Sequence, residues 1–374
     1  MRAQIRFNMK DATLIEEINQ ALAFDFAKVT LRQVKKALSR ETLALEDLGA
    51  LLSPAAEAFL EPMAQRAQDA TSRHFGRNVA VYTPLYIANH CVNHCLYCGY
   101  SQLNEVQRGA LALEEIDREL NSIKAQGFSD VLLLTGESRQ KSGPKYIAAA
   151  LKLAAQKFAS VGLEVYPLKA EEYALAKEAG ADYVCVYQET YDPVAYDRAH
   201  LKGPKKNYRW RLLAPSRALE AGIRGVGLGA LLGLSDFRPD VLALGAHGRF
   251  LTQAHPAADL AFSTPRLRPV PGTRERFGEV SEKELTQIIL ALRVFAPSFG
   301  LSLSTRERPY FRDHLIGLGV TRLSAGVKTS VGGHGGPERG AEQFLTADGR
   351  GVEEICAAIV ARGHQPVFVD YARL

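Results

Sequence analysis

Long apolar runs are missing from this 374-residue sequence, and so is a marked excess of one charge sign. No stretch approaches the roughly 18 uninterrupted apolar residues that a membrane span needs. The first residues, MRAQIRFNMKDATLIEEI, carry acids where a signal peptide has an apolar run. Lys plus Arg number 46 and Asp plus Glu 41, interspersed along the chain, and the net charge of +5 includes no basic tail for nucleic acid. We expect a cytoplasmic protein that binds neither membrane nor nucleic acid.

Cysteine is also scarce, but its distribution is informative. The five cysteines stand at positions 91, 95, 98, 185 and 356, so that three fall within eight residues. An odd, clustered set in a cytosolic chain argues for thiolate ligands and against a disulfide framework. The rest of the composition, 47% hydrophobic and 23% charged, is typical of a globular protein with a large core and excludes a disordered or fibrous one.

The first 78 residues are expected to form a helical extension that packs on the main domain. Ser53 and Pro54 resemble an N-cap and a first-turn proline, apolar residues follow at helical spacing, and Gly76 ends the pattern.

Eight short apolar or β-branched runs follow and alternate with amphipathic stretches. The runs are 80–88, 131–135, 163–168, 183–188, 225–232, 260–264, 301–305 and 322–328. Helices are indicated over 113–126 by its apolar face and after Ser281, which forms a capping-box motif with Glu284. Eight strands alternating with helices over about 250 residues favour a (β/α)8 or TIM barrel over an open doubly wound sheet. We place this α/β barrel at residues 79–330.

Residues 331–374 are expected to add a loop and a last helix over 352–361. The glycine-rich run VGGHGGPERG, at 331–340, predicts a mobile loop over the barrel mouth. A phosphate-binding role is less favoured because no clear helix start follows the run closely.

Cys91, Cys95 and Cys98 form a C-x3-C-x2-C motif directly after the first predicted strand. In a barrel this position is the C-terminal face, where active sites collect. Three thiolates at this spacing can each bind one iron of a four-iron cluster and leave the fourth iron open. A structural zinc completed by His90 or His94 is the alternative, although zinc sites more often use two separated C-x2-C pairs.

This motif, with Tyr97 before the third cysteine, resembles the signature of the radical S-adenosylmethionine (SAM) superfamily. Further motifs resemble the 2-iminoacetate synthase family, the tyrosine lyases of thiamine thiazole biosynthesis. These motifs, in order between residues 82 and 307, are YTPLYIANHCVNHCLYCGY, LLLTGE, VYQETY, AHLKG, WRL, GLGALLGLSD, PRLRP and LSTRE.

The resemblance implies a [4Fe-4S] cluster on the three cysteines, with SAM bound to the open iron. It further implies that a deoxyadenosyl radical removes hydrogen from the amine of L-tyrosine. Scission of the Cα–Cβ bond then gives 2-iminoacetate and a 4-hydroxybenzyl radical, which is reduced to 4-cresol. In such enzymes the cofactor carries the radical chemistry, while the protein supplies orientation and excludes water.

The resemblance implies four residues that bind the cofactor, which are Tyr97, Glu137, Glu189 and Arg211. Glu137, in the TGE motif, resembles the acid that meets the amino group of SAM, which is a charge-assisted contact. Glu189 and Arg211 resemble the acid and the base that hold its ribose or amine and its carboxylate. A loop acid for Glu137 and a surface helix arginine for Arg211 are the structural alternatives.

Gly227, Gly229 and Gly233 lie in or beside an apolar run, where glycine weakens strand pairing. By the resemblance, Gly227 and Gly229 would let adenine and ribose approach. Tight packing inside the barrel explains these glycines equally well.

Three residues are expected to serve the substrate, in the order Arg306, Arg268 and Ser324. Arg306 resembles the arginine that clamps the substrate carboxylate in aromatic amino acid lyases, and arginine offers a bidentate fork for that group. Arg268 faces the mouth if the barrel is correct, although an arginine paired with Glu137 or Glu307 would show the same pattern. Ser324 is a hydroxyl helper, or else a buried structural serine.

Two related activities are excluded by the number of ligands. The maturation enzyme that makes carbon monoxide and cyanide carries a second, C-terminal cysteine cluster, whereas only Cys356 lies in that region here. Biotin synthase needs a second cluster in its barrel, which Cys185 alone could not hold. Both cysteines are expected to be small buried hydrophobes.

The rival functions are a tryptophan lyase, the deazaflavin precursor synthase, or a non-catalytic zinc or iron–sulfur scaffold. The expected partners are thiazole synthase, because the imine product hydrolyses in water, and a flavodoxin or ferredoxin type reductant.

Overall fold

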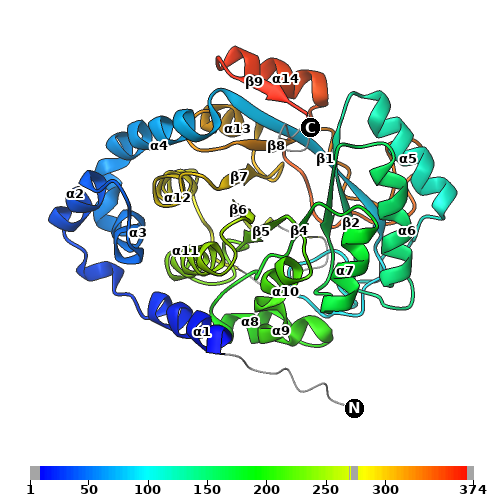
Figure 1. Ribbon diagram of the computed structural model, residues 1–374, viewed down its shortest axis with the longest axis horizontal. Coiled ribbons are helices and arrows are strands. Elements are labelled where there is room, and N and C mark those ends of the chain that lie inside the picture. The colour runs from blue at the N-terminus through cyan, green and yellow to red at the C-terminus, as the bar shows by residue number, and fades with distance from the viewer. Residues whose placement is uncertain (1–8, 269, 271–276, 369–374) are drawn as a thin grey trace.

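Eight parallel strands close into a barrel with helices around it (Figure 1). The structure is a computed structural model that describes residues 9–268, 270 and 277–368. The first eight residues, Pro269 of the PRLRP motif, residues 271–276 and residues 369–374 lie outside the described residues.

The barrel strands are β1 (Asn78–Ala88), β2 (Asp130–Thr135), β3 (Ser160–Glu164), β4 (Tyr183–Cys185), β5 (Gly225–Gly229), β6 (Asp259–Ser263), β7 (Gly300–Leu303) and β8 (Arg322–Ser324). Each strand pairs in parallel with the next, and β1 pairs with both β2 and β8, which closes the ring. The TIM barrel predicted from the alternating pattern is confirmed.

Most strand predictions agree with the structure to within a few residues, but the third is shifted. The run predicted over 163–168 begins in the structure at Ser160 and ends at Glu164. Pro167 lies inside the predicted run and has no backbone N–H for a ladder. Val165 and Leu168 are buried outside the sheet instead. The apolar run therefore indicated which residues are buried, but not which residues pair in the sheet.

The outer helices are α5 (Leu113–Ala125), α6 (Pro144–Ala155), α7 (Ala170–Glu178), α8 (Pro193–Ala199), α9 (Tyr208–Leu212), α10 (Ala214–Glu220), α11 (Phe237–Ala254), α12 (Glu282–Phe295) and α13 (Pro309–Leu315), with a short 3-10 turn, η3 (Pro204–Lys206). The capping box of α12 forms as predicted. The backbone N–H of Glu284 donates to the Ser281 hydroxyl at 3.2 Å, and the backbone N–H of Ser281 donates to the Glu284 carboxylate at 2.8 Å.

An N-terminal group of helices covers one flank of the barrel (Figure 1). It consists of α1 (Met9–Leu22), η1 (Phe26–Lys28), α2 (Leu31–Ser39), α3 (Leu45–Leu52), η2 (Pro54–Phe59) and α4 (Leu60–Phe75). α1 packs on α11, and both α3 and α4 pack on α12. The predicted cap at Ser53 is wrong in detail, because its hydroxyl donates to the carbonyl of Ala50 at 2.7 Å and Pro54 begins only a 3-10 turn.

The C-terminal part adds α14 (Val352–Ala361), as predicted, and a ninth strand that was not predicted, β9 (Gln365–Val367). β9 pairs in parallel with the first residues of β1, outside the closed ring. The glycine-rich segment 331–340 packs against α5, since the backbone N–H groups of His334 and Gly335 donate to the Glu119 carboxylate at 2.6 and 2.9 Å. The segment is therefore held against α5 and is not the free loop over the barrel mouth that the sequence predicted.

The barrel interior is hollow because small side chains replace the bulky branched residues that usually fill it. Gly227, Ala261, Ser263, Gly300 and Ser302 line a lower cavity of about 650 Å³ near the amino ends of the strands. An upper cavity of about 140 Å³ lies at the carboxyl ends. Tyr82, Leu132, Tyr187, Ser263 and Ser302 line both cavities.

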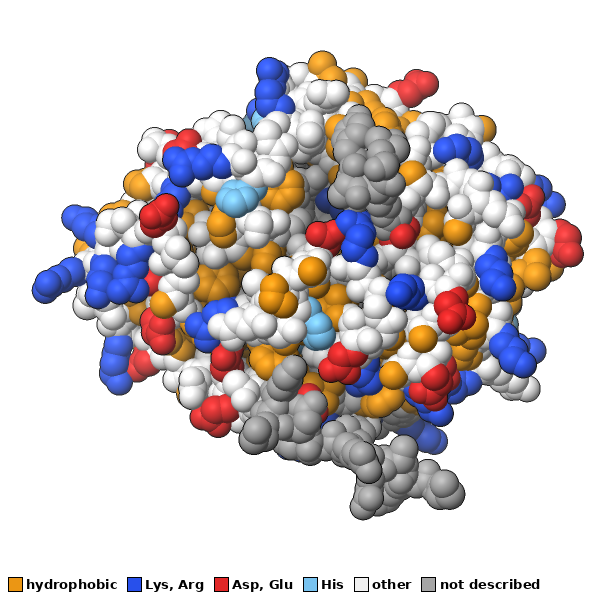
Figure 2. Space-filling model, viewed as in Figure 1, with side chains coloured by type: hydrophobic (Ala, Val, Ile, Leu, Met, Phe, Trp, Pro, Cys, Tyr) orange, Lys and Arg blue, Asp and Glu red, His pale blue; other side chains and the backbone are white. Residues whose placement is uncertain are grey.

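Acidic and basic side chains are interspersed over the face shown in Figure 2. None of the helices in the described part of the chain combines the length and the apolar content that crossing a bilayer requires.

Candidate active site at the carboxyl ends of the strands

The loop after β1 carries the three clustered cysteines. Cys95 is buried, whereas Cys91 and Cys98 are partly exposed. Backbone hydrogen bonds fix this loop, from the N–H of Val92 to the carbonyl of Glu137 at 2.9 Å and from the N–H of Leu96 to the carbonyl of Ala199 at 3.1 Å. The cysteines therefore lie beside the end of β2, at the C-terminal face where the sequence placed them.

The donor set fits a multi-iron cluster better than a single ion. A zinc ion draws its ligand atoms to about 2.0–2.3 Å from one point. Among the described residues, no three His, Cys, Asp or Glu side chains are placed to hold one metal ion. A four-iron cluster binds each thiolate to a different iron, so its cysteines need not converge on a point. Burial raises the pKa of the Cys95 thiol, and nearby Lys205 opposes that effect.

Glu189 lies four residues past Cys185, the last residue of β4, and accepts hydrogen bonds from two cationic side chains. Its carboxylate accepts from Lys205 Nζ at 2.7 Å and from Arg211 Nη2 at 3.2 Å. All three side chains are nearly buried. Burial raises the pKa of Glu189, but the charges of Lys205 and Arg211 outweigh burial and lower it to about 2. Arg211 is thus a buried ion-pair residue, and the surface helix arginine is ruled out.

The backbone at Glu189 is strained, with a φ of 74° that is rare for a side chain of this size. Its carbonyl accepts from the N–H of Leu231 at 2.7 Å, which ties the conformation to the segment after β5. Strain of this kind persists where the surroundings over-determine it, and such places are often functional.

Tyr97 lies between the cysteine loop and this ion cluster. Its hydroxyl is 2.8 Å from His200 Nε2, while His200 Nδ1 is 2.7 Å from the carbonyl of Tyr196. Burial, with the charge of Lys205 adding to it, lowers the pKa of His200 to about 3. The histidine is therefore neutral, with Nδ1 donating to the carbonyl and Nε2 accepting from Tyr97. This arrangement fixes the Tyr97 ring 5.4 Å from Lys205 Nζ.

Five of the predicted site residues meet at the upper cavity. Tyr97, Cys98, Glu189, Arg306 and Ser324 all line it. They come from the cysteine loop and from the ends of β4, β7 and β8, which are distant in sequence. Gly229 and Arg211 do not line the cavity but contact residues that do.

Arg306 carries a cation that has no acidic partner. Its guanidinium lies 3.6 Å from the centre of the Phe344 ring, and within the described part of the chain the guanidinium makes neither a hydrogen bond nor an ion pair. Ser324, buried on β8, lines the same space. A planar cation held ready in a cavity suits a carboxylate ligand.

Arg268 does not line the upper cavity. It pairs with Glu307, which is the structural alternative that the sequence left open. Its Nη2 lies 3.2 Å from the fully buried Glu307 carboxylate, which Arg266 also contacts. Its Nε donates to the backbone carbonyl of Arg306 at 2.7 Å. Arg268 therefore contacts Arg306 through the backbone carbonyl of that residue.

Glu137 faces the cysteine loop. Its carboxylate accepts from Asn93 Nδ2 at 2.6 Å, and the same amide group lies 3.7 Å from Cys91 Sγ. Because the carboxylate is partly exposed, it retains room for a further donor.

Close packing leaves little room for a side chain at the glycines. A Cβ on Gly227 would lie 2.7 Å from Cys185 Sγ, and one on Gly229 would lie 2.6 Å from the carbonyl of Ser263. Gly227 lines the lower cavity, away from the cysteine loop. Gly233 has a φ of +115°, which only glycine adopts without strain. For Gly227, the expected contact with the cofactor is therefore not supported.

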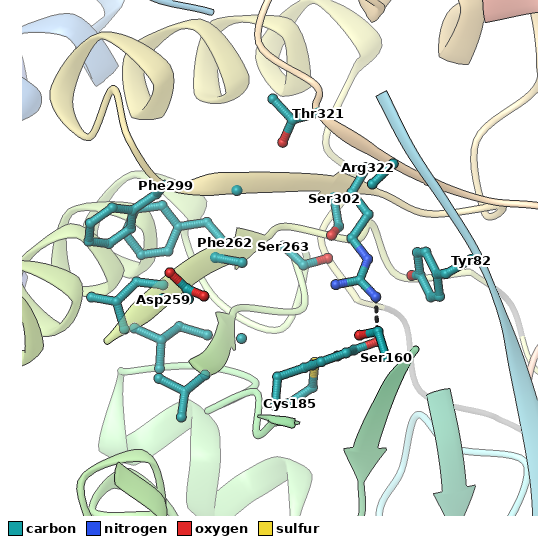
Figure 3. Close-up of a pocket in the computed structure, with 18 of the residues that line it drawn as sticks. Tyr82, Ser160, Cys185, Asp259, Phe262, Ser263, Phe299, Ser302, Thr321 and Arg322 are labelled. Carbon is teal, nitrogen blue, oxygen red and sulfur yellow. Dashed lines mark hydrogen bonds between the residues drawn. The ribbon is translucent and has the colours of Figure 1, made fainter. Parts of the chain in front are cut away.

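Arg322 is one of the cations that line the lower cavity, and Figure 3 shows its side chain extending into the cavity beside Tyr82. The guanidinium lies 4.4 Å from the centre of the Tyr82 ring and pairs with Asp130 at 2.6 Å. Its charge is thus already balanced. Cys185 lines this cavity and Cys356 is partly exposed, so neither is the fully buried hydrophobe that was expected.

Two functional candidates escaped the sequence analysis. Lys205 lies two residues after the AHLKG motif, which ends at Gly203, and the sequence analysis did not single it out. Glu164 ends β3 and lines the upper cavity. The predicted strand ran on to Leu168, which placed Glu164 inside a strand instead of at its carboxyl end. Correct strand ends would have identified Glu164.

Comparison with known proteins agrees with this geometry. The family model of the Radical SAM superfamily matches residues 85–242, and that of the Biotin and Thiamin Synthesis associated domain matches residues 263–365. 2-Iminoacetate synthase of Salmonella typhimurium is 44% identical over 343 residues, which cover 91% of this chain and 91% of that protein. The Escherichia coli 2-iminoacetate synthase matches with the same identity and coverage.

Solved structures share the fold. A crystal structure of HydG, a maturase of the [FeFe]-hydrogenase, superimposes with a TM-score of 0.87 at 30% identity and covers 97% of this chain and 81% of that chain. Methylornithine synthase (PylB) superimposes with a TM-score of 0.72 at 21% identity, covering 90% of this chain and 97% of that chain, a likeness of fold alone.

Proposed function

Because the chain belongs to the 2-iminoacetate synthase family of radical SAM enzymes, we propose that it cleaves the Cα–Cβ bond of L-tyrosine to 2-iminoacetate and 4-cresol. The product would supply the thiazole moiety of thiamine. One observation carries the proposal: Cys98 and the unpaired guanidinium of Arg306 line the same cavity. A carboxylate-bearing substrate held at Arg306 would thus lie next to the cysteine loop.

Cys91, Cys95 and Cys98 would hold a [4Fe-4S] cluster, and SAM would bind beside it. Together the two cofactors supply one-electron cleavage of a sulfonium and a carbon radical that removes hydrogen from the substrate. The protein's own task is to orient both molecules and to keep water away.

Glu137 and the Glu189–Arg211 pair would bind SAM. Glu137 can accept a hydrogen bond from the SAM amine, since its carboxylate already faces the cysteine loop. With its pKa lowered to about 2, Glu189 is ionised at neutral pH and can accept from the ribose hydroxyls. Arg211 keeps donors for the SAM carboxylate because only one terminal nitrogen contacts Glu189. Tyr97 would pack against the cofactor from the cysteine loop.

Arg306 would clamp the α-carboxylate of L-tyrosine through two parallel N–H donors, with the Ser324 hydroxyl as a helper. The stacked Phe344 ring limits the orientations of the guanidinium and shields it from solvent. Arg268 would be a positioning residue, because its bond to the Arg306 carbonyl fixes the backbone of Arg306 while the Arg268 side chain stays outside the cavity.

The proposed partners follow from the chemistry. An imine hydrolyses in water, so 2-iminoacetate would pass to thiazole synthase, and the radical step requires an electron from a flavodoxin or ferredoxin type protein.

The test is an anaerobic reconstitution with iron and sulfide, followed by reductant, SAM and either L-tyrosine or L-tryptophan. We expect 4-cresol and glyoxylate, the hydrolysis product of the imine, from tyrosine only. Deoxyadenosine without cresol would keep the radical enzyme and discard tyrosine as substrate. Neither product from a well-formed cluster would overturn the catalytic assignment.

A further inference from the structure

We propose that Glu164 recognises the phenol of the substrate and accepts a hydrogen bond from the tyrosine hydroxyl at the β3 side of the upper cavity. This inference rests on the proposed function and names the residue that selects tyrosine over amino acids without a ring hydroxyl.

Glu164 ends β3, where it pairs with Leu134 of β2. Its side chain lines the upper cavity. The neighbouring walls are apolar or aromatic and come from β1, β2 and the segment after β4. They consist of Tyr82, Tyr86, Leu132, Leu134 and Tyr187. A slot with such walls suits an aromatic ring, and one carboxylate among them fixes where a polar group of that ring must point.

The carboxylate of Glu164 has no partner of its own. It makes no hydrogen bond or ion pair with any residue between 9 and 368 that the structure describes. Glu164 is only partly exposed, and an acid withdrawn from water in this way is usually paired because an unpaired charge there is costly. Burial, helped by the negative charge of Glu189, raises the pKa of Glu164 to about 7 despite the cations across the cavity. No structural role accounts for an acid placed in this way.

Arg306 supplies the complementary half of the site. Its guanidinium is also unpaired, and it lines the same cavity. β3 and β7 are separated by three strands on one side and three on the other, so they lie across the barrel from each other. The two opposite charges do not pair with each other. An amino acid bound by its carboxylate at Arg306 therefore extends its side chain toward β3.

The phenol is a better partner for Glu164 than the substrate ammonium. A carboxylate that binds an ammonium stabilises its protonated form. The proposed reaction removes hydrogen from the amine, which favours the neutral form. A phenol O–H, by contrast, donates to a carboxylate without such a conflict. Phenylalanine would leave the partly buried carboxylate unpaired, and sites built to bind a substrate hydroxyl reject analogues that lack it by large factors.

The experiment compares L-tyrosine with L-phenylalanine. Both dissociation constants are measured by equilibrium dialysis on the reconstituted, SAM-loaded enzyme without reductant, for wild type, Glu164→Ala and Glu164→Gln. We expect Glu164→Ala to lose preference for tyrosine by a factor on the order of 100, mostly through weaker tyrosine binding. Glu164→Gln keeps an acceptor oxygen and should retain most of the preference. Glu342→Ala is the matched control, since this exposed acid precedes Gln343, which lines the same cavity.

Iron content and the thermal midpoint of each variant show whether it is folded and loaded. Equal weakening for both amino acids in Glu164→Ala would assign Glu164 to the ammonium and overturn the phenol contact. An unchanged preference would overturn any role in recognition. Failure of the proposed function is distinguishable, because it would show as wild-type enzyme that forms no 4-cresol.

Discussion

Arg268 donates from Nε to the backbone carbonyl of Arg306 at 2.7 Å, while its Nη2 contacts the buried Glu307. Arg268, which was expected to bind substrate, thus supports Arg306, whose guanidinium is free to do so. Because the carbonyl belongs to Arg306 itself, three residues after the end of β7, this bond helps to fix where the Arg306 side chain enters the cavity.

Arg268→Ala should raise the dissociation constant of L-tyrosine by about 3-fold to 10-fold, since one hydrogen bond that positions Arg306 is lost. Deoxyadenosine formation without substrate should change little. Equilibrium dialysis and single-turnover assays measure the two quantities. Loss of tyrosine binding as complete as that of an Arg306 variant would show that Arg268 contacts the substrate directly.

Arg306→Ala should weaken L-tyrosine binding by about 30-fold, which corresponds to about 2 kcal/mol for a charge-assisted clamp. Uncoupled cleavage of SAM should continue, because the cofactor contacts lie elsewhere. Arg308→Ala is the control, since that exposed arginine pairs with Glu282 and does not line the upper cavity. An unchanged tyrosine requirement would move the carboxylate site to another residue.

Cys95→Ala should abolish both cluster assembly and 4-cresol formation, because the remaining two thiolates cannot hold a four-iron cluster in place. Iron and sulfide content and the visible absorption of the anaerobically reconstituted protein measure assembly. Cys356→Ala, at a partly exposed cysteine on α14, should behave like wild type. Deoxyadenosine formed by Cys95→Ala would contradict the cluster assignment.

Gly229→Ala should reduce the free energy of unfolding by about 1–3 kcal/mol, since the new methyl would overlap the Ser263 carbonyl and the Tyr187 ring. Gly349→Ala, where no atom lies within 4 Å of the added Cβ, should have almost no effect. Denaturant unfolding provides the comparison. A Gly229 variant with normal stability but weakened SAM binding would instead support contact with adenine.

His247 should make the fold less stable in mild acid. Burial lowers its pKa to about 3, so the folded protein keeps the ring neutral while the unfolded chain takes up a proton below its ordinary value of 6.5. This contribution to stability is complete above that value and is lost as the pH falls toward 3. Between about pH 7.5 and about pH 5.5, the free energy of unfolding should therefore fall by about 1.4 kcal/mol.

Denaturant unfolding at the two pH values measures this contribution. His247→Gln should lack it, whereas a His74→Gln variant, changed at an exposed position of α4, should retain it. An equal pH dependence in wild type and His247→Gln would contradict the prediction.

The sequence alone determined the barrel and the position of its chemistry. The period of its apolar runs specifies strand and helix alternation, and the cysteine motif follows the first strand directly, so the parallel connection places it at the C-terminal face. Local signals such as the Ser281 capping box depend on neighbouring residues and were confirmed for that reason.

Only the tertiary structure decided which charges are free. Arg266 and Arg268 belong to the PRLRP motif, and Arg306 belongs to the LSTRE motif. The first two pair with Glu307, whereas Arg306 faces the cavity without an acidic partner among the described residues. The hollow interior and the unpaired Glu164 depend on which small residues of different strands meet inside the ring. Such contacts join residues far apart in the chain, and no local pattern encodes the partner that a buried charge will find.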